Sequence, residues 1–267
     1  MGEFNFTIKY DSGAKEFDGL DHYYGAQSLF GISQILLIGF HAFFNKDILT
    51  QAPSAKGFRL VLGKSKTGSW EQAIQLVITD QTVMQVANDL GKNALYDLLK
   101  WVLLTGVGGR YALKYRKSIK RARELEREND DLQEKLDEAL RRAHSPVKHQ
   151  GLNVHVMSGR TTLVTFNEST LNYLETELIS DETQIVDCAI SRFNARTGTG
   201  RLIKSLDAVS VPFMPIDRLP PTQNTALADN LGQVARGIFA PTKLLVSEVT
   251  DSAGYIKRYR LHRVIRN

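Results

Sequence analysis

The stretch Arg110–Ala143 constrains the fold of this chain more than any other segment. It contains neither Gly nor Pro and is rich in Leu, Ala, Glu, Lys and Arg, which favour helix. We therefore predict one long helix over residues 110–144, which ends before Pro146. Such a helix divides the chain into three parts, namely 1–109, the helix itself and 145–267.

Positions in this helix repeat with heptad spacing. One series falls at 115, 122, 129, 136 and 143, and a second, three residues later, falls at 118, 125, 132 and 139. A single Asn at an a position between Leu residues at d fixes register and favours two parallel strands. The pattern predicts a dimerising coiled coil, while an antiparallel contact within one chain and a solitary spacer helix stay open. The predicted oligomerisation residues are Leu125, Asn129, Leu132 and Leu136.

The charges of the long helix are unevenly distributed. Its middle is mostly acidic, whereas its first third is basic, and this permits either a solvated face or a phosphate-contacting stripe. The basic residues are Arg110, Lys114, Arg116, Lys117, Lys120, Arg121 and Arg123.

The first part of the chain predicts a two-layer α+β domain, with helices on one face of a mostly antiparallel sheet. Residues 4–10 alternate as a half-buried strand, and 21–45 form an apolar helix whose glycines, such as Gly31, imply close approach of a neighbour. A hairpin over 58–78 follows, and then a helical region over 82–105 that Gly91 divides.

Two glycine-rich loops fail as phosphate-binding motifs. Gly63–Ser69 lacks the spacing of a phosphate loop and leads into a strand rather than a helix. The TGVGG run over 105–109 follows a helix, so it is a break and not a dinucleotide fingerprint.

The apolar run Leu29–Phe44 is shorter than a membrane span and carries polar residues, which favours a buried helix. The single cysteine, Cys188, excludes a disulfide within the chain and fits a reducing compartment. The sequence thus predicts a cytoplasmic protein without membrane association. It shows no cofactor or metal motif, because its histidines lack cysteine partners or zinc spacing.

The last part reads as three strands, a helix and two strands, the element order of a small OB-like β-barrel. The run Ile190–Ile203 also resembles the first hairpin of the cold-shock domain, with Phe-Asn before a Gly-x-Gly turn. That resemblance implies base stacking, but Thr199 and Arg201 replace the aromatic residues that follow the turn.

Basic residues concentrate in this last part, against a net charge of only +5 for all 267 residues. A basic strand with flanking tyrosines suits contact with phosphates and bases, and equally a solvated edge. The predicted nucleic-acid-binding residues are Arg192, Phe193, Arg196, Arg201, Lys204, Arg258 and Arg260.

The whole chain resembles an uncharacterised bacterial protein family, through Phe6–Asp11, Gly68-Ser69 and Val211–Phe213. The resemblance implies a bacterial setting near phage-defence genes and no established activity. We therefore predict a non-catalytic, oligomerising protein that binds nucleic acid or nucleotide through its barrel. Two alternatives stay open: a scaffold that binds a second protein, and a hydrolase or nuclease centred on Asp21-His22.

Overall fold

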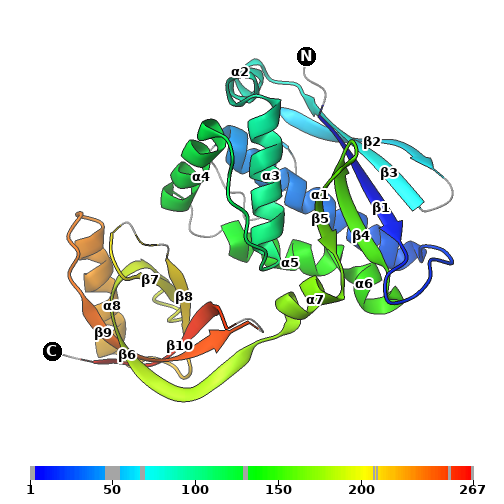
Figure 1. The fold of residues 1–267 in the computed structure, drawn as a ribbon. Coiled ribbons are helices and arrows are strands. Elements are labelled where there is room, and N and C mark those ends of the chain that lie inside the picture. The colour runs from blue at the N-terminus through cyan, green and yellow to red at the C-terminus, as the bar shows by residue number, and fades with distance from the viewer. Residues whose placement is uncertain are drawn as a thin grey trace. The chain divides into compact units, whose positions relative to one another are not determined.

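The computed structural model describes residues 4–45, 55–66, 70–128, 132–206, 208, 210–251 and 254–265. They form two compact units, Met1–Leu174 and Glu175–Asn267. The first unit combines several helices with a sheet, and the second combines helix α8 with a sheet of its own (Figure 1). The predicted α+β class is therefore confirmed.

The first unit contains a five-stranded sheet in the order β2-β3-β1-β4-β5. Neighbouring strands in it run antiparallel throughout the described residues, as predicted. The strands are β1 (Phe4–Asp11), β2 (Phe58–Lys66), β3 (Trp70–Ile78), β4 (Asn153–Ser158) and β5 (Thr161–Phe166). The tip of the β2–β3 hairpin, residues 67–69, lies outside the described residues.

The core of this unit lies between the sheet and its helices. Phe4, Phe6, Ile8 and Tyr10 alternate along β1 and are all buried, as their spacing predicts. Helix α1 (His22–Asn45) packs on them and is long and apolar enough to cross a membrane. However, 67% of its most apolar window is buried inside the unit, so α1 has the burial of a core helix.

Gly91 divides the next helical region, as predicted. It joins α2 (Gln81–Leu90) to α3 (Lys92–Gly106) with a φ of 79°, a conformation that glycine adopts without strain. Asp80 caps α2 by accepting hydrogen bonds from the N–H groups of Thr82 and Val83.

The prediction of a single helix over residues 110–144 is wrong. Residues 110–115 precede α4 (Arg116–Glu128), and α5 (Leu132–Ala143) follows as a second helix. Leu125 and Leu136 are each only 1% exposed and belong to the core of their own unit. Their side chains are therefore not available for contact with a second chain. Asn129 and the side chain of Leu132 lie outside the described residues.

The close contact lies instead within the chain, between α5 and α1. A Cβ atom on Gly31 would stand 2.5 Å from the Ala139 carbonyl oxygen and 2.6 Å from the Ala143 nitrogen. Ser28 Oγ donates a 2.8 Å hydrogen bond to the Ala143 carbonyl and accepts one from the Tyr10 hydroxyl. The glycine in α1 thus permits the close approach that the sequence implied.

The first unit also extends further than predicted. Helix α6 (Ser145–Gln150) and strands β4 and β5 complete its sheet, and α7 (Glu168–Glu175) stands at its end. The expected boundary at residue 145 therefore differs from the structure. Pairing of β1 with β4, residues far apart in sequence, places this segment in the first sheet.

In the second unit, five strands pair in the order β10-β8-β7-β6-β9, and β9 pairs in turn with β10, so the ring closes. The pairing of β8 with β10 is parallel. The strands are β6 (Leu178–Phe193), β7 (Gly200–Ile203), β8 (Val211–Pro215), β9 (Thr242–Thr250) and β10 (Ile256–Ile265).

Helix α8 (Pro221–Val234) packs against this ring of strands. Its Leu227 is fully buried in the second core. Its Asn230 accepts a 2.7 Å hydrogen bond from the Ile190 N–H and donates one of 2.7 Å to the Ala240 carbonyl. Ile190 adjoins an irregularity in the β6–β7 pairing, so this amide side chain supplies a partner to a strand N–H.

Candidate nucleic-acid interface

The interior of the strand ring determines which side chains face outward. Ile190, Leu202 and Phe213 are buried in its core, and so are Tyr259 and Leu261 of β10. Because side chains alternate along a strand, Arg201 and Arg260 point away from this core. Arg201 is the cross-strand partner of Arg192 and of Pro212, and Arg260 is that of Met214.

The β6–β7 turn is built by its own backbone and side chains. Asn194 Oδ1 accepts hydrogen bonds from the N–H groups of Arg196 and Thr197, at 3.0 and 3.4 Å. Gly198 has a φ of 74°, and a Cβ on Gly200 would stand 2.4 Å from the Arg192 carbonyl oxygen. The Gly-x-Gly pattern therefore meets a steric need, and the turn holds Arg196 exposed.

Arg201 has a structural role that the sequence does not disclose. Its side chain is 8% exposed, with Nε donating a 2.6 Å hydrogen bond to Ser210 Oγ and a terminal nitrogen donating one of 3.0 Å to the Ser210 carbonyl. The guanidinium ties the segment before β8 to β7. We therefore remove Arg201 from the residues expected to contact a ligand directly.

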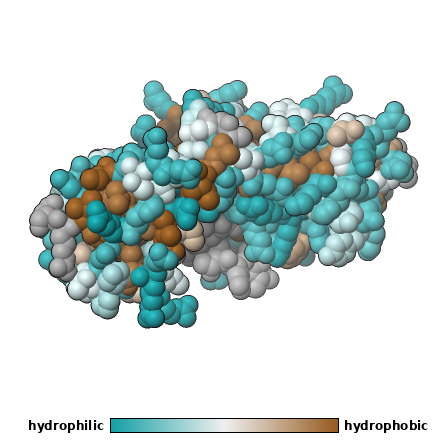
Figure 2. All heavy atoms as spheres, turned by 90° about the horizontal axis from the view of Figure 1, so that it is seen from below, coloured by the Kyte–Doolittle hydropathy of each residue, from teal (hydrophilic) through white to brown (hydrophobic). Residues whose placement is uncertain are grey.

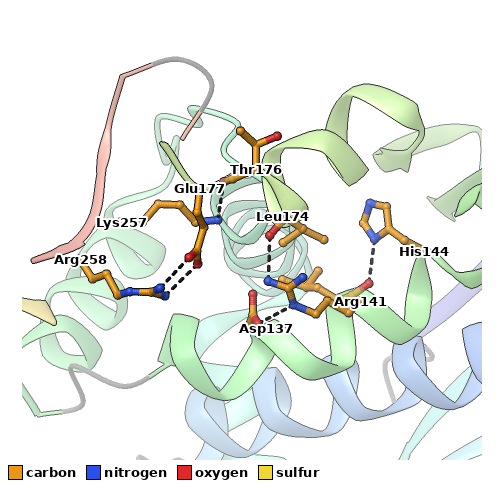
Figure 3. A network of polar contacts seen from close by, with 9 residues as sticks. Asp137, Arg141, His144, Leu174, Thr176, Glu177, Lys257 and Arg258 are labelled. Carbon is orange, nitrogen blue, oxygen red and sulfur yellow. Dashed lines mark hydrogen bonds and ion pairs between the residues drawn. The ribbon is translucent and has the colours of Figure 1, made fainter. Parts of the chain in front are cut away.

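Arg258 is also engaged. Its guanidinium forms a two-pronged ion pair with Glu177, with nitrogen–oxygen distances of 2.8 and 2.6 Å (Figure 3). Beside it, Lys257 Nζ donates a 3.3 Å hydrogen bond to the Thr176 carbonyl. These contacts connect the start of the second unit to β10. Arg258 therefore has a structural role, because its charge is paired with Glu177.

The remaining predicted residues keep accessible surface. Arg192, Arg196 and Lys204 are exposed, Arg260 is half-buried, and Phe193 packs partly against the second core. Arg192 lies at the end of β6, Arg196 lies within the β6–β7 turn, and Lys204 directly follows β7. The structure thus brings Arg192 and Arg196 to one hairpin and places Arg260 on β10, which pairs with β8.

Two exposed apolar residues were not predicted as part of the interface. Met214 is 41% exposed and is the cross-strand partner of Arg260, and Tyr255 is 49% exposed in the β9–β10 turn. Strict alternation would put Tyr255 on the same face as Tyr259 and Leu261, but those two side chains are buried in the core and Tyr255 is exposed. The register irregularity between Ile256 and Arg258 breaks that alternation, and no local sequence signal marks it.

Asp21, which was considered for catalysis, has a structural role. Asp21 caps α1 by accepting hydrogen bonds from the Tyr23 and Tyr24 N–H groups, and His22 is exposed at the start of that helix. Burial raises the pKa of the Cys188 thiol to about 12, so it stays protonated near neutral pH. Within the described residues, no group of three or more His, Cys, Asp or Glu is placed to hold a metal ion.

These features define an α+β protein of two units, the second a closed ring of strands with basic side chains on its outer surface. Residues 6–175 match the family model described as Domain of unknown function (DUF7946), which covers more than half of the chain. The chain belongs to this family, which confirms the resemblance to an uncharacterised family. No curated protein and no solved structure matches the chain.

The family segment covers nearly the same residues as the first unit, Met1–Leu174. It contains Phe6–Asp11 and Gly68-Ser69, on which the resemblance rested, but not Val211–Phe213. The second unit, with its basic residues, lies beyond the matched segment, so its role must be argued from its own geometry.

Proposed function

We propose that the second unit binds nucleic acid in an extended, single-stranded form. The proposal rests on one observation: the strands pair in a particular order, and basic side chains lie on the outer surface of the ring they form. Numbered within the unit, the strands pair as 1-2-3-5-4-1, with the third parallel to the fifth and a helix before the fourth. That connectivity is OB-like, and OB folds bind oligonucleotides on strands 2 and 3 and on the loops that join strands 1–2 and 4–5.

Accessible cations lie at or next to these positions. Arg196 lies in the loop between the first two strands, and Arg192 lies at the end of the first strand. Lys204 follows the second strand, and Arg260 of the fifth strand pairs with Met214 of the third. Tyr255 lies in the loop between the last two strands, where an aromatic ring can stack on a base. Phosphate contacts would provide affinity, and stacking on Tyr255 would tolerate any base.

The test is fluorescence anisotropy of a labelled 20-nucleotide oligo(dT) with the full chain at two salt concentrations. Arg192, Arg196 and Arg260 are replaced together by Ala. The slope of log K against log salt concentration should then become less steep, by about 0.7 for each phosphate that is no longer neutralised. Lys243→Ala is the matched control for each single substitution among these three, because Lys243 is an exposed cation on β9, which does not pair with β7 or β8. Binding that is absent, insensitive to salt or weakened equally by the control contradicts the proposal.

A second candidate is a protein-binding scaffold. Leu178, Ile179 and Ile185 on the first half of β6 are each at least half exposed, and Figure 2 shows apolar side chains on the surface of the second unit. Assembly with a second copy, the phage-defence setting and the cytoplasmic location also stay predictions. Light scattering of the full chain would separate the candidates, since a monomer that binds oligo(dT) favours the first.

A further inference from the structure

The first unit contains a basic cleft that the barrel proposal does not use. The cleft has a volume of about 410 Å³ and lies between the junction of α2 with α3 and the start of α4. Its lining residues are Leu90, Gly91, Lys92, Asn93, Ala94, Tyr115, Arg116 and Lys117. Among these described residues there are three cations and no acidic side chain, around a space of the size that small ligands occupy.

The cations come from two segments and are held in place by different contacts. Lys117 Nζ donates a hydrogen bond to the Asp89 carbonyl, and Lys92 Nζ lies 5.9 Å from the centre of the Tyr96 ring. Arg116 is exposed at the first position of α4. These positions concentrate positive potential in the cleft, where a doubly charged group would be attracted by several cations at once.

Hydrogen bonds to Asp97 of α3 hold the segment that forms one wall of the cleft. Buried Asp97 accepts hydrogen bonds from the Tyr111 hydroxyl at 2.7 Å and from the Lys114 and Tyr115 N–H groups at 2.8 and 3.2 Å. It also accepts one from the Ser118 hydroxyl. The segment that carries Tyr115 and Arg116 is therefore anchored to α3, so the cleft wall is preorganised rather than a mobile loop end.

Two further features determine the kind of anion. Neither α3 nor α4 has an acidic residue in its first turn. The dipole of α3 therefore adds to the potential of the three cations, whereas the Asp97 carboxylate offsets the dipole of α4 at its start. Tyr115 is 43% exposed in the wall and offers a ring face, and Asn93 offers both a donor and an acceptor. A nucleotide presents a matching group to each of them: phosphates to the cations, the face of its base to the Tyr115 ring, and polar atoms of its base or sugar to Asn93.

We propose that this cleft binds a nucleoside phosphate, with Lys92, Arg116 and Lys117 on the phosphates and Tyr115 against the base. The basic first third of the predicted long helix then provides a specific site rather than only a solvated face. The site belongs to the family segment and is independent of the barrel, so either proposal can fail alone.

Isothermal titration of the full chain with ADP, pyrophosphate and adenosine tests the proposal. We expect ADP to bind more tightly than either part, and Arg116→Ala or Lys92→Ala to weaken ADP at least tenfold. Tyr115→Ala should weaken ADP but leave pyrophosphate unchanged, and its fold is checked by circular dichroism. Should Tyr115→Ala unfold the chain, Tyr115→Ser is used, judged by the same ratio of ADP to pyrophosphate affinity.

The matched control is Arg123→Ala, which removes an equal charge from the exposed surface of the same helix, two turns beyond the cleft. It should leave ADP affinity within twofold. Absence of ADP binding, equal affinity for pyrophosphate, or an equal loss in Arg123→Ala overturns the proposal.

Discussion

Two glycines of α1 predict opposite responses to the same substitution. At Gly31 an added Cβ would stand 2.5 Å from the Ala139 carbonyl oxygen and 2.9 Å from Arg142 Cβ. At Gly39 an added Cβ would meet only Phe43 ring atoms, at 3.8 Å, which is an ordinary contact distance. We therefore expect Gly31→Ala to destabilise the first unit and Gly39→Ala to stabilise it.

The magnitude follows from two effects. Alanine gains about 1 kcal/mol over glycine inside a helix, and this gain is shared by both variants. At Gly31 the backbone of α5 must retreat by roughly 1 Å, and overpacking of this kind costs about 1–3 kcal/mol. The difference in unfolding free energy between the two variants isolates that packing cost, so it should be about 1–3 kcal/mol.

Urea unfolding followed by tryptophan fluorescence measures this difference directly. Both tryptophans of the chain, Trp70 and Trp101, belong to the first unit, so their emission reports on that unit. The reasoning is refuted if Gly31→Ala proves as stable as Gly39→Ala, because the close approach of α1 and α5 would then lack energetic consequence.

Two further predictions concern buried polar groups. Asn230→Ala leaves the Ile190 N–H and the Ala240 carbonyl without this partner and should destabilise the second unit by about 1–3 kcal/mol, measured by hydrogen exchange of the Ile190 amide. Asn224→Ala on the same helix is the control and should cost less, because Asn224 Oδ1 is buried and accepts no hydrogen bond within the described chain; equal losses would contradict the assignment. Burial opposes ionisation of Asp97, but the hydrogen bonds from Ser118, Tyr111, Lys114 and Tyr115 outweigh it, so the pKa of Asp97 lies below its ordinary value of 3.8. The stabilisation by Asp97 is present above pH 3.8 and is lost as pH falls through its lower folded pKa, so the urea midpoint should drop with acid in the wild type and less in Asp97→Asn. An identical pH dependence in the two proteins would refute this role.

Local patterns predicted much of the fold. The alternation in β1, the extent of α1 and the break at Gly91 all follow from residue spacing and backbone preference. The strand–helix order of the second unit is likewise visible in the sequence. Each of these features depends on interactions among neighbours in the chain, where hydrophobic period and turn chemistry are strong signals.

Features that depend on distant partners were not predictable. Strand β5 was not assigned to the first sheet, because its place there depends on pairing between β1 and β4, some 150 residues apart. Arg201 was predicted to contact nucleic acid, yet its hydrogen bonds to Ser210 keep its side chain buried. Arg258 similarly pairs with Glu177, a residue about 80 positions away. A single sequence carries no register for such contacts.

The error over the long helix has a specific physical cause. Spacings of three and four describe a coiled-coil seam, but they equally describe one helix packed on a neighbour within the same core. The small residues discriminate between these cases. Ala139 and Ala143 occupy heptad positions where a dimer gains more from Leu or Ile, and both face the place where α1 presents Gly31. Alanine opposite glycine lets the helix backbones approach closely, so the Ala-rich pattern marks a partner inside the chain.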